Sequence, residues 1–154
     1  MKQYKVSAYK LGLVKDSEVF YESAKLNTST DSYKLLCKFM NPETTRLQEV
    51  FSMVGVNNNN TPIGWYQVSV GGVAGTVVDP RLIFSTALGW MATGIIVCHN
   101  HPSGNLTPSG FDIELTRQLV SGGKVLQIKV MDHIIVNGEL TDYYSFADNG
   151  VIID

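Results

Sequence analysis

The sequence predicts an α/β (α+β) fold in which one mixed β-sheet is flanked by helices. Helical and extended patterns alternate along the chain, which is typical of such folds. The apolar run Ile95–Cys98 is typical of a strand that is buried on both faces. The length of 154 residues is close to that of one domain. We therefore expect a single domain over residues 1–154, with residues 1–30 as an N-terminal strand extension and the functional motifs within residues 31–154.

The first predicted elements are strands followed by a helix. Tyr4–Leu13 and Glu18–Phe20 contain loosely alternating apolar residues, which indicates a hairpin or an edge strand. Thr30–Ser32 offers N-cap side chains to a helix over Tyr33–Met40. Asn41-Pro42 should end this helix, because the residue before a proline avoids the helical region.

Two strands and a second helix are expected next. Leu47–Val56 and Trp65–Val73 have strand-like patterns, and the turn between them is predicted at Asn57–Asn60. Asp79-Pro80 starts a helix that should run to about Ala92, and Gly94 separates it from the buried strand.

The C-terminal part begins with a loop over His101–Pro108, which is rich in Pro, Ser, Gly and Asn. A helix is predicted from Ser109 to about Ser121, where Gly122-Gly123 should stop it. Leu126–Asn137 and Tyr143–Ile153 should supply two or three closing strands.

Composition and charge argue against several classes of function. Twelve basic and fourteen acidic residues give a net charge of −2, which disfavours autonomous binding to nucleic acid. No apolar stretch approaches the roughly 20 residues of a membrane span, and Met1–Lys10 lacks the apolar core of a signal peptide. Cys37 and Cys98 form no C-x-x-C motif, so we expect buried thiols in a reducing compartment. A cytoplasmic protein without membrane association is predicted.

Two histidines, His99 and His101, directly follow the buried strand. Side chains two residues apart in an extended chain point to the same side, so both imidazoles can converge on one ion. Asp112, near the start of the next helix, is placed to return over the loop as an oxygen ligand. Two histidines, a carboxylate and a water molecule match the open coordination of a catalytic zinc ion.

These residues also have structural interpretations. Ser109 and Asp112 form an S-x-x-D helix capping box, in which the carboxylate would only accept backbone N–H groups. An H-x-H motif alone is weak evidence for a metal. The metallo-β-lactamase pattern would need aspartate in place of Ser103, and the HNH nuclease motif spreads over a ββα unit. The metal hypothesis is favoured because two histidines at the solvent end of a strand have no evident packing role.

A cysteine and one pair of residues outside the motif are also expected to be structural. Cys98 should point away from the face of His99 and pack in the core. Asp132-His133 could support metal ligands or bind metal, but a polar pair at a sheet edge is the favoured interpretation.

The run His99–Gly104, followed by Pro108-Ser109 and Asp112, resembles the RadC-like branch of the JAB/MPN (JAMM) metalloprotease family. The family signature is a distant glutamate, then H-x-H, then S-x-x-D. The likeness extends from about Asp31 to the C-terminus. Other stretches similar to RadC are Val78–Phe84, Asp132–Val136 and Ser145-Phe146.

The resemblance implies a JAB/MPN (cytidine-deaminase-like) architecture and zinc-dependent hydrolysis of a peptide or isopeptide bond. It implies a general base on an early strand; Glu49 in Gln48–Phe51 resembles the family's E-V-F entry to that strand, and Glu43 is its nearest rival. It also implies that Ser109 stabilises the oxyanion. One Zn²⁺ per chain, with a bound water, is the expected cofactor, and a peptide or protein is the expected substrate.

Two other functions remain open. One is a DNA-repair-associated accessory module, as the RadC name suggests, although no part of the sequence resembles the N-terminal helix-hairpin-helix region of RadC proteins and the net charge disfavours DNA association. The other is a non-catalytic interaction scaffold, although such domains usually lack the ligands that this chain retains. The sequence indicates neither the substrate nor the oligomeric state.

Overall fold

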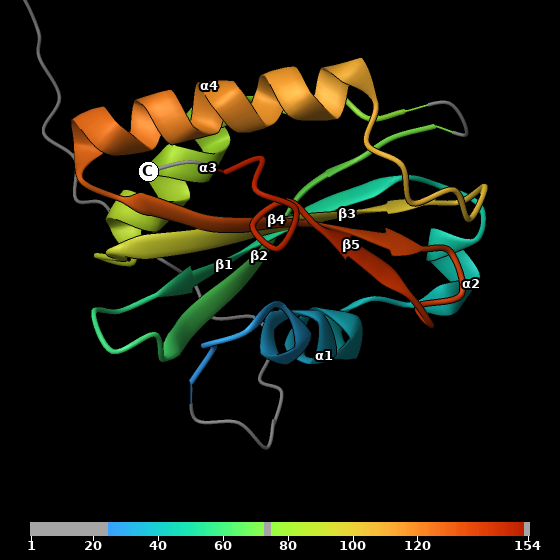
Figure 1. The fold of residues 1–154 in the computed structure, drawn as a ribbon, viewed down its shortest axis with the longest axis horizontal. Coiled ribbons are helices and arrows are strands. Elements are labelled where there is room, and N and C mark those ends of the chain that lie inside the picture. Colours follow the sequence, from blue (N-terminus) through green and yellow to red (C-terminus); the bar gives the residue numbers. More distant parts are fainter. Residues whose placement is uncertain (1–24, 73–74, 153–154) are drawn as a thin grey trace, which may run out of the picture.

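A computed structural model describes residues 25–72 and 75–152. The hairpin or edge strand expected over Tyr4–Leu13 and Glu18–Phe20 lies outside the described residues. The arrangement of the described elements confirms the predicted α/β fold, with one mixed sheet flanked by helices (Figure 1).

The sheet has five strands in the order β2-β1-β3-β4-β5. Only β3 and β4 pair in parallel, whereas the other neighbouring strands pair antiparallel. This puts the end of β3, where the H-x-H motif lies, near the middle of the sheet. The strands are β1 (Val50–Val56), β2 (Pro62–Val70), β3 (Gly94–His101), β4 (Lys129–Asn137) and β5 (Tyr143–Ser145).

The helices cover both faces of the sheet. α3 and α4 lie on one face, and α1 lies on the other (Figure 1). The loop between β3 and α4 therefore brings the start of α4 back toward the end of β3. The helices are α1 (Ser29–Phe39), α2 (Pro42–Thr45), α3 (Pro80–Gly89) and α4 (Gly110–Leu126).

β3 is buried on both faces, as its apolar run predicts. Ile95 and Val97 belong to the core beneath α3 and α4. Ile96 and Cys98 belong to the core on the opposite, α1 side, which confirms the expected packing role of Cys98. Because side chains alternate along a strand, the next odd-numbered residue, His99, faces α4.

Several boundaries differ from the predicted ones. α1 begins at Ser29 because Thr28, and not a residue of Thr30–Ser32, is the N-cap. β1 begins at Val50 because the amides of Leu47 and Gln48 still donate to the Thr44 carbonyl at the end of α2. α3 ends at Gly89, before Ala92, since Met91 takes up a left-handed conformation with φ of 56°. β2 already begins at Pro62.

The predicted stop of α4 at Gly122-Gly123 is wrong, because the helix continues to Leu126. A Cβ atom on Gly123 would lie 2.4 Å from the carbonyl oxygen of Ile128. Glycine is thus required here for the close approach of the helix to the following chain, and not to end the helix. The strand predicted over Leu126–Asn137 consequently begins at Lys129. Among the described residues, no helix is long and apolar enough to span a bilayer.

Candidate metal centre

His99, His101 and Asp112 meet where β3 ends and α4 begins. One potential ligand atom from each residue lies within 4.8 Å of the others, so the group could hold a metal ion. His99 and Asp112 are buried, and His101 is partly buried. The structure therefore brings together the three residues that the sequence indicated as ligands.

The ring nitrogens of both histidines face the Asp112 carboxylate. Nε2 of His99 lies 3.1 Å from Oδ1, and Nε2 of His101 lies 3.6 Å from Oδ2. The two Nε2 atoms are 3.0 Å apart. Two imidazole nitrogens and a carboxylate oxygen, all turned toward one point, form a donor set suited to zinc.

The loop after β3 fixes the orientation of the His101 ring. Its Nδ1 atom is 2.5 Å from the carbonyl oxygen of Asn105. A carbonyl only accepts hydrogen bonds, so Nδ1 carries the proton, and Nε2 of the neutral ring keeps its lone pair toward Asp112. Gly104, with φ of 79°, allows the tight turn that returns Asn105 to the ring.

Asp112 caps α4 and faces the histidines at the same time. Its Oδ2 atom accepts from the Ser109 amide at 2.6 Å, and its own amide donates to Ser109 Oγ at 3.2 Å. This is the reciprocal capping box that the S-x-x-D pattern predicts. Cap and candidate ligand, which the sequence presents as alternatives, are combined in one carboxylate.

The site's electrostatics favour a charged carboxylate. Desolvation of Asp112 acts to raise its pKa, but the hydrogen bonds that His101 and His99 donate in their protonated forms outweigh it and hold the pKa well below the usual value. The same hydrogen bond to Asp112 raises the pKa of His101, against the effect of its own burial. The cluster thus combines an anionic carboxylate oxygen with two imidazole nitrogens, which are atoms that can bind a cation.

The two candidate general bases, Glu49 and Glu43, differ in their surroundings. Glu49 immediately precedes β1 and is partly buried, and burial raises the pKa of its carboxyl. Attraction to the protonated forms of His99 and His101 opposes this rise. Glu43 is exposed on α2.

Asn100, the residue between the two histidines, is fully buried and holds the backbone on both sides of Glu49. Its Oδ1 atom accepts from the Val50 amide at 2.7 Å. Its Nδ2 atom donates to the carbonyls of Thr45 at 2.7 Å and Gln48 at 2.8 Å. The sequence predicts no role for Asn100; its position inside the H-x-H motif is the signal that points to it.

The interpretation of Asp132-His133 as a sheet-edge pair is wrong. β4 lies inside the sheet, between β3 and β5, and both side chains are buried. Asp132 accepts hydrogen bonds from Ser145 Oγ, the Ala147 amide and the His133 amide at 2.6–3.0 Å. His133 turns the other way, with Nε2 at 2.8 Å from His99 Nδ1. Burial, aided by the charge of His99, holds the pKa of His133 well below its usual value.

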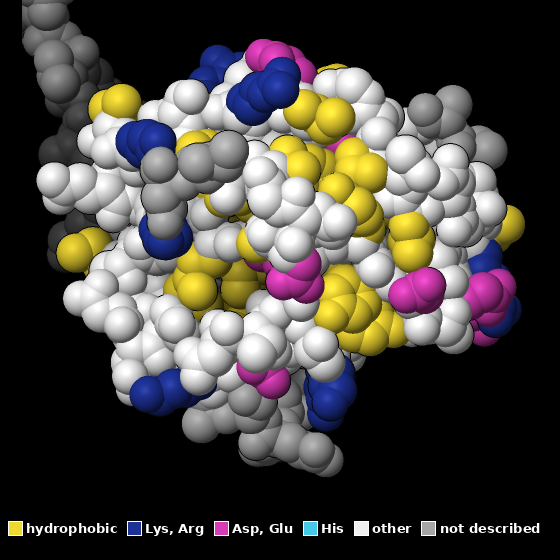
Figure 2. Space-filling view, viewed as in Figure 1, with side chains coloured by type: hydrophobic (Ala, Val, Ile, Leu, Met, Phe, Trp, Pro, Cys, Tyr) yellow, Lys and Arg dark blue, Asp and Glu magenta, His cyan; other side chains and the backbone are white. Residues whose placement is uncertain are grey.

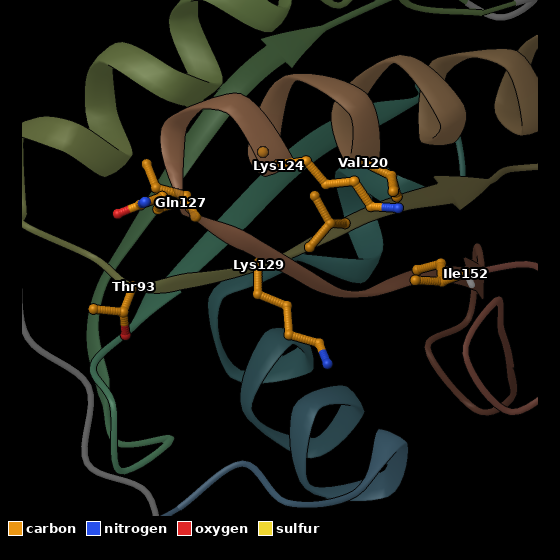
Figure 3. Close-up of a pocket in the computed structure, with 9 residues that line it drawn as sticks. Thr93, Val120, Lys124, Gln127, Lys129 and Ile152 are labelled. Carbon is orange, nitrogen blue, oxygen red and sulfur yellow. The ribbon is translucent and has the colours of Figure 1, made fainter. Parts of the chain in front are cut away.

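Other features of the described surface are a pocket and the distribution of its charged side chains. A pocket of about 290 Å³ lies at the opposite end of α4, and its labelled residues include Lys124, Gln127 and Ile152 (Figure 3). None of the residues that line this pocket is a histidine, cysteine, aspartate or glutamate that could bind a metal ion. On the face shown in Figure 2, the Lys and Arg side chains lie apart and are interspersed with Asp and Glu. This view shows no basic patch that would fit a phosphate backbone.

Comparisons with known proteins agree on one family. The model of the RadC-like JAB domain family matches residues 26–151. A UPF0758 protein of Flavobacterium johnsoniae is 40% identical over 147 residues, which make up 95% of this chain and 62% of that protein. A UPF0758 protein of Clostridioides difficile is 35% identical over 153 residues, covering 92% of this chain and 64% of that protein. The chain thus spans less than two thirds of the length of these two relatives.

Proposed function

The chain belongs to the RadC-like JAB domain family, and we propose that it is a zinc-dependent hydrolase that cleaves an amide bond in a peptide or protein. The observation that carries this proposal is the convergence of His99, His101 and Asp112 within 4.8 Å at the end of a buried strand. Zinc is the metal we propose, because two imidazoles and one carboxylate are a ligand set of catalytic zinc.

His99, His101 and Asp112 would hold the ion through Nε2, Nε2 and the carboxylate. Zinc bound there would lower the pKa of water toward neutrality and polarise a carbonyl group. The anionic carboxylate reduces the net charge of the loaded site, and its cap contacts with Ser109 limit how far it can move.

Glu49 is the proposed general base. Its carboxylate would take a proton from the attacking water and return it to the leaving amine nitrogen, so that the bond breaks without release of an amide anion. Two features support this role: the side chain is only partly buried, which leaves it open to substrate, and its carboxyl interacts electrostatically with both histidines. Asn100 would hold it there through the backbone of Gln48 and Val50.

Ser109 is the proposed oxyanion donor. Its side-chain oxygen accepts from the Asp112 amide, and this contact leaves the hydroxyl proton available for a substrate oxygen. Ser109 is exposed at the start of α4, where the helix dipole also favours negative charge. The hydroxyl would therefore stabilise the charge that develops on the carbonyl oxygen during attack.

The proposal is tested by comparing the wild-type protein with Glu49→Gln and Glu43→Gln. Each is loaded with Zn²⁺, analysed for metal content and incubated with a peptide library that is read by mass spectrometry for new termini. We expect about one zinc per chain in all three proteins. Cleavage should fall on the order of 10²–10⁴-fold in Glu49→Gln and stay unchanged in Glu43→Gln.

Two results would contradict the proposal. One is a folded wild-type protein that binds no zinc at micromolar concentrations. The other is a Glu49→Gln variant that cleaves as fast as the wild type.

A further inference from the structure

Behind the His99 ring, a buried chain of polar contacts connects β3, β4 and α4. Nδ1 of His99 is 2.8 Å from Nε2 of His133. Nδ1 of His133 is 2.7 Å from Oγ1 of Thr116, and that hydroxyl is 2.6 Å from the carbonyl oxygen of Asp112. His99, His133 and Thr116 are each at most 1% exposed, so water does not take part in these contacts.

The Asp112 carbonyl, the last group in this series of contacts, sets the direction of the hydrogen bonds. The Asp112 carbonyl can only accept, so the single hydroxyl proton of Thr116 is donated to it. Thr116 Oγ1 must then accept from the neighbouring ring, which puts a proton on Nδ1 of His133.

The His133 ring is enclosed by aromatic side chains. Phe146 stacks on it at a centroid distance of 4.6 Å, and Phe51 packs against it edge-on at 5.6 Å. A charged ring would lose its hydration in this setting, so the ring is neutral. With Nδ1 protonated, Nε2 of His133 is an acceptor, and the hydrogen bond from His99 must come from the proton on Nδ1 of His99.

The consequence is that Nε2 of His99 has no proton and directs its lone pair at Asp112 and His101. Nε2 of His101 is likewise unprotonated, because its Nδ1 donates to Asn105. Two lone pairs 3.0 Å apart repel each other, so this arrangement calls for a cation at that point, either a metal ion or a shared proton.

We propose that Thr116 and His133 are positioning residues that hold His99 in the Nδ1–H tautomer and so make Nε2 its ligating atom. This inference rests on the proposed metal function, and it assigns a purpose to two residues outside the H-x-H and S-x-x-D motifs. Metal ligands commonly depend on such a partner for the free ring nitrogen, and loss of the partner weakens metal binding by roughly 10–100-fold.

The variant Thr116→Val tests the proposal, because it removes the hydroxyl while keeping the shape of the side chain. Thr116→Ser restores the hydroxyl. Thr86→Val is the matched control: Thr86 Oγ1 also donates to the carbonyl four residues earlier, at 2.7 Å, but on α3 and without a histidine partner. Competition with a fluorescent chelator gives the Zn²⁺ affinity of each. We expect a 10–100-fold loss in Thr116→Val only.

A second readout needs no metal. The chain has three histidines, so their ring nitrogens can be assigned by NMR in ¹⁵N-labelled, metal-free protein. At slightly alkaline pH, the wild type should show all three rings protonated on Nδ1. In Thr116→Val, His133 and His99 should populate the Nε2–H form.

The two readouts separate this inference from the proposed function. A protein that binds no zinc but shows the Nδ1–H form of His99, shifted by Thr116→Val, would contradict the function and support the positioning role. Equal zinc affinity and unchanged tautomers in Thr116→Val would overturn the positioning role. A wild-type His99 ring that lacks the proton on Nδ1 and carries it on Nε2 alone would also overturn it, even if Thr116→Val fails to fold.

Discussion

The Asp112 carboxylate accepts a hydrogen bond of 2.6 Å from the Ser109 amide, and thereby joins the first turn of α4 to the candidate metal centre. The same type of cap occurs in α1, where Asp31 accepts from the Thr28 amide at 3.1 Å. Only the α4 cap faces histidines. The two capping boxes therefore form a matched pair in which capping can be separated from metal binding.

Asp112→Ala should lose both functions, whereas Asp31→Ala should lose only a cap. Loss of the α4 cap is expected to cost about 1 kcal/mol of unfolding free energy. Zinc at 100 times its Kd should stabilise the wild type by roughly 2.7 kcal/mol. We expect this increment to persist in Asp31→Ala and to shrink sharply in Asp112→Ala. Urea unfolding with and without Zn²⁺ measures it, and equal increments in both variants would contradict the role of Asp112 as a ligand.

Asn100→Ala should impair both stability and hydrolysis while leaving most zinc binding intact. The change leaves the Val50 amide and the Thr45 and Gln48 carbonyls without their partner, at about 1–3 kcal/mol for each group that stays buried and unsatisfied. It also releases the backbone that holds Glu49. The expected result is a larger fall in kcat than in zinc affinity.

Asn137→Ala is the control for that experiment. Asn137 also makes three side-chain hydrogen bonds, but to Thr141 and Asp142 in the turn after β4. It should lose stability without a specific fall in kcat. If kcat falls equally in both variants at a temperature where both are folded, Asn100 does not position Glu49.

The stability of the metal-free protein should decrease on acidification because of His133. Burial lowers the pKa of this ring in the folded state below its ordinary value of about 6.5, so the unfolded chain binds the proton more readily. The neutral His133 ring therefore makes its full contribution to the free energy of unfolding above about pH 6.5. This contribution is lost as the pH falls below that value, by at most about 1.4 kcal/mol per pH unit.

Urea unfolding of the wild type and His133→Gln from pH 7.5 to 5.5, in a chelator, isolates this contribution. His101, whose pKa is raised, contributes the opposite slope in both proteins and largely cancels in the comparison. The wild type should lose stability more steeply than the variant. If the unfolding free energies of the two proteins change in parallel with pH, the pKa of His133 does not differ between the folded and the unfolded state, and the prediction is wrong.

Local patterns predicted much of this molecule. The apolar run Ile95–Cys98 located a central strand, the spacing of His99 and His101 placed both rings on one face, and S-x-x-D located the start of α4. The combination of cap and candidate ligand in Asp112 was not evident, because it depends on how the loop folds back. Zinc itself, and the roles of Glu49 and Ser109, remain predictions.

Contacts between distant segments explain the errors. Asn100 reaches residues about 50 positions earlier, and His99 reaches His133, 34 positions later. No local periodicity reports such pairs. The wrong helix end at Gly122-Gly123 has the same origin, since only the approach of Ile128 to the helix reveals why glycine is needed at Gly123.

The residues of the candidate site are separated by different lengths of sequence. Residues 99–112 carry all three candidate ligands in one continuous stretch, whereas Glu49 reaches them only through the pairing of β1 with β3. Closing a longer stretch of chain costs more entropy. The proposed ion site is thus encoded locally and the proposed general base is brought in by strand pairing, so a molecule whose first strand has detached would keep the three candidate ligands in one segment but would lose the proposed base.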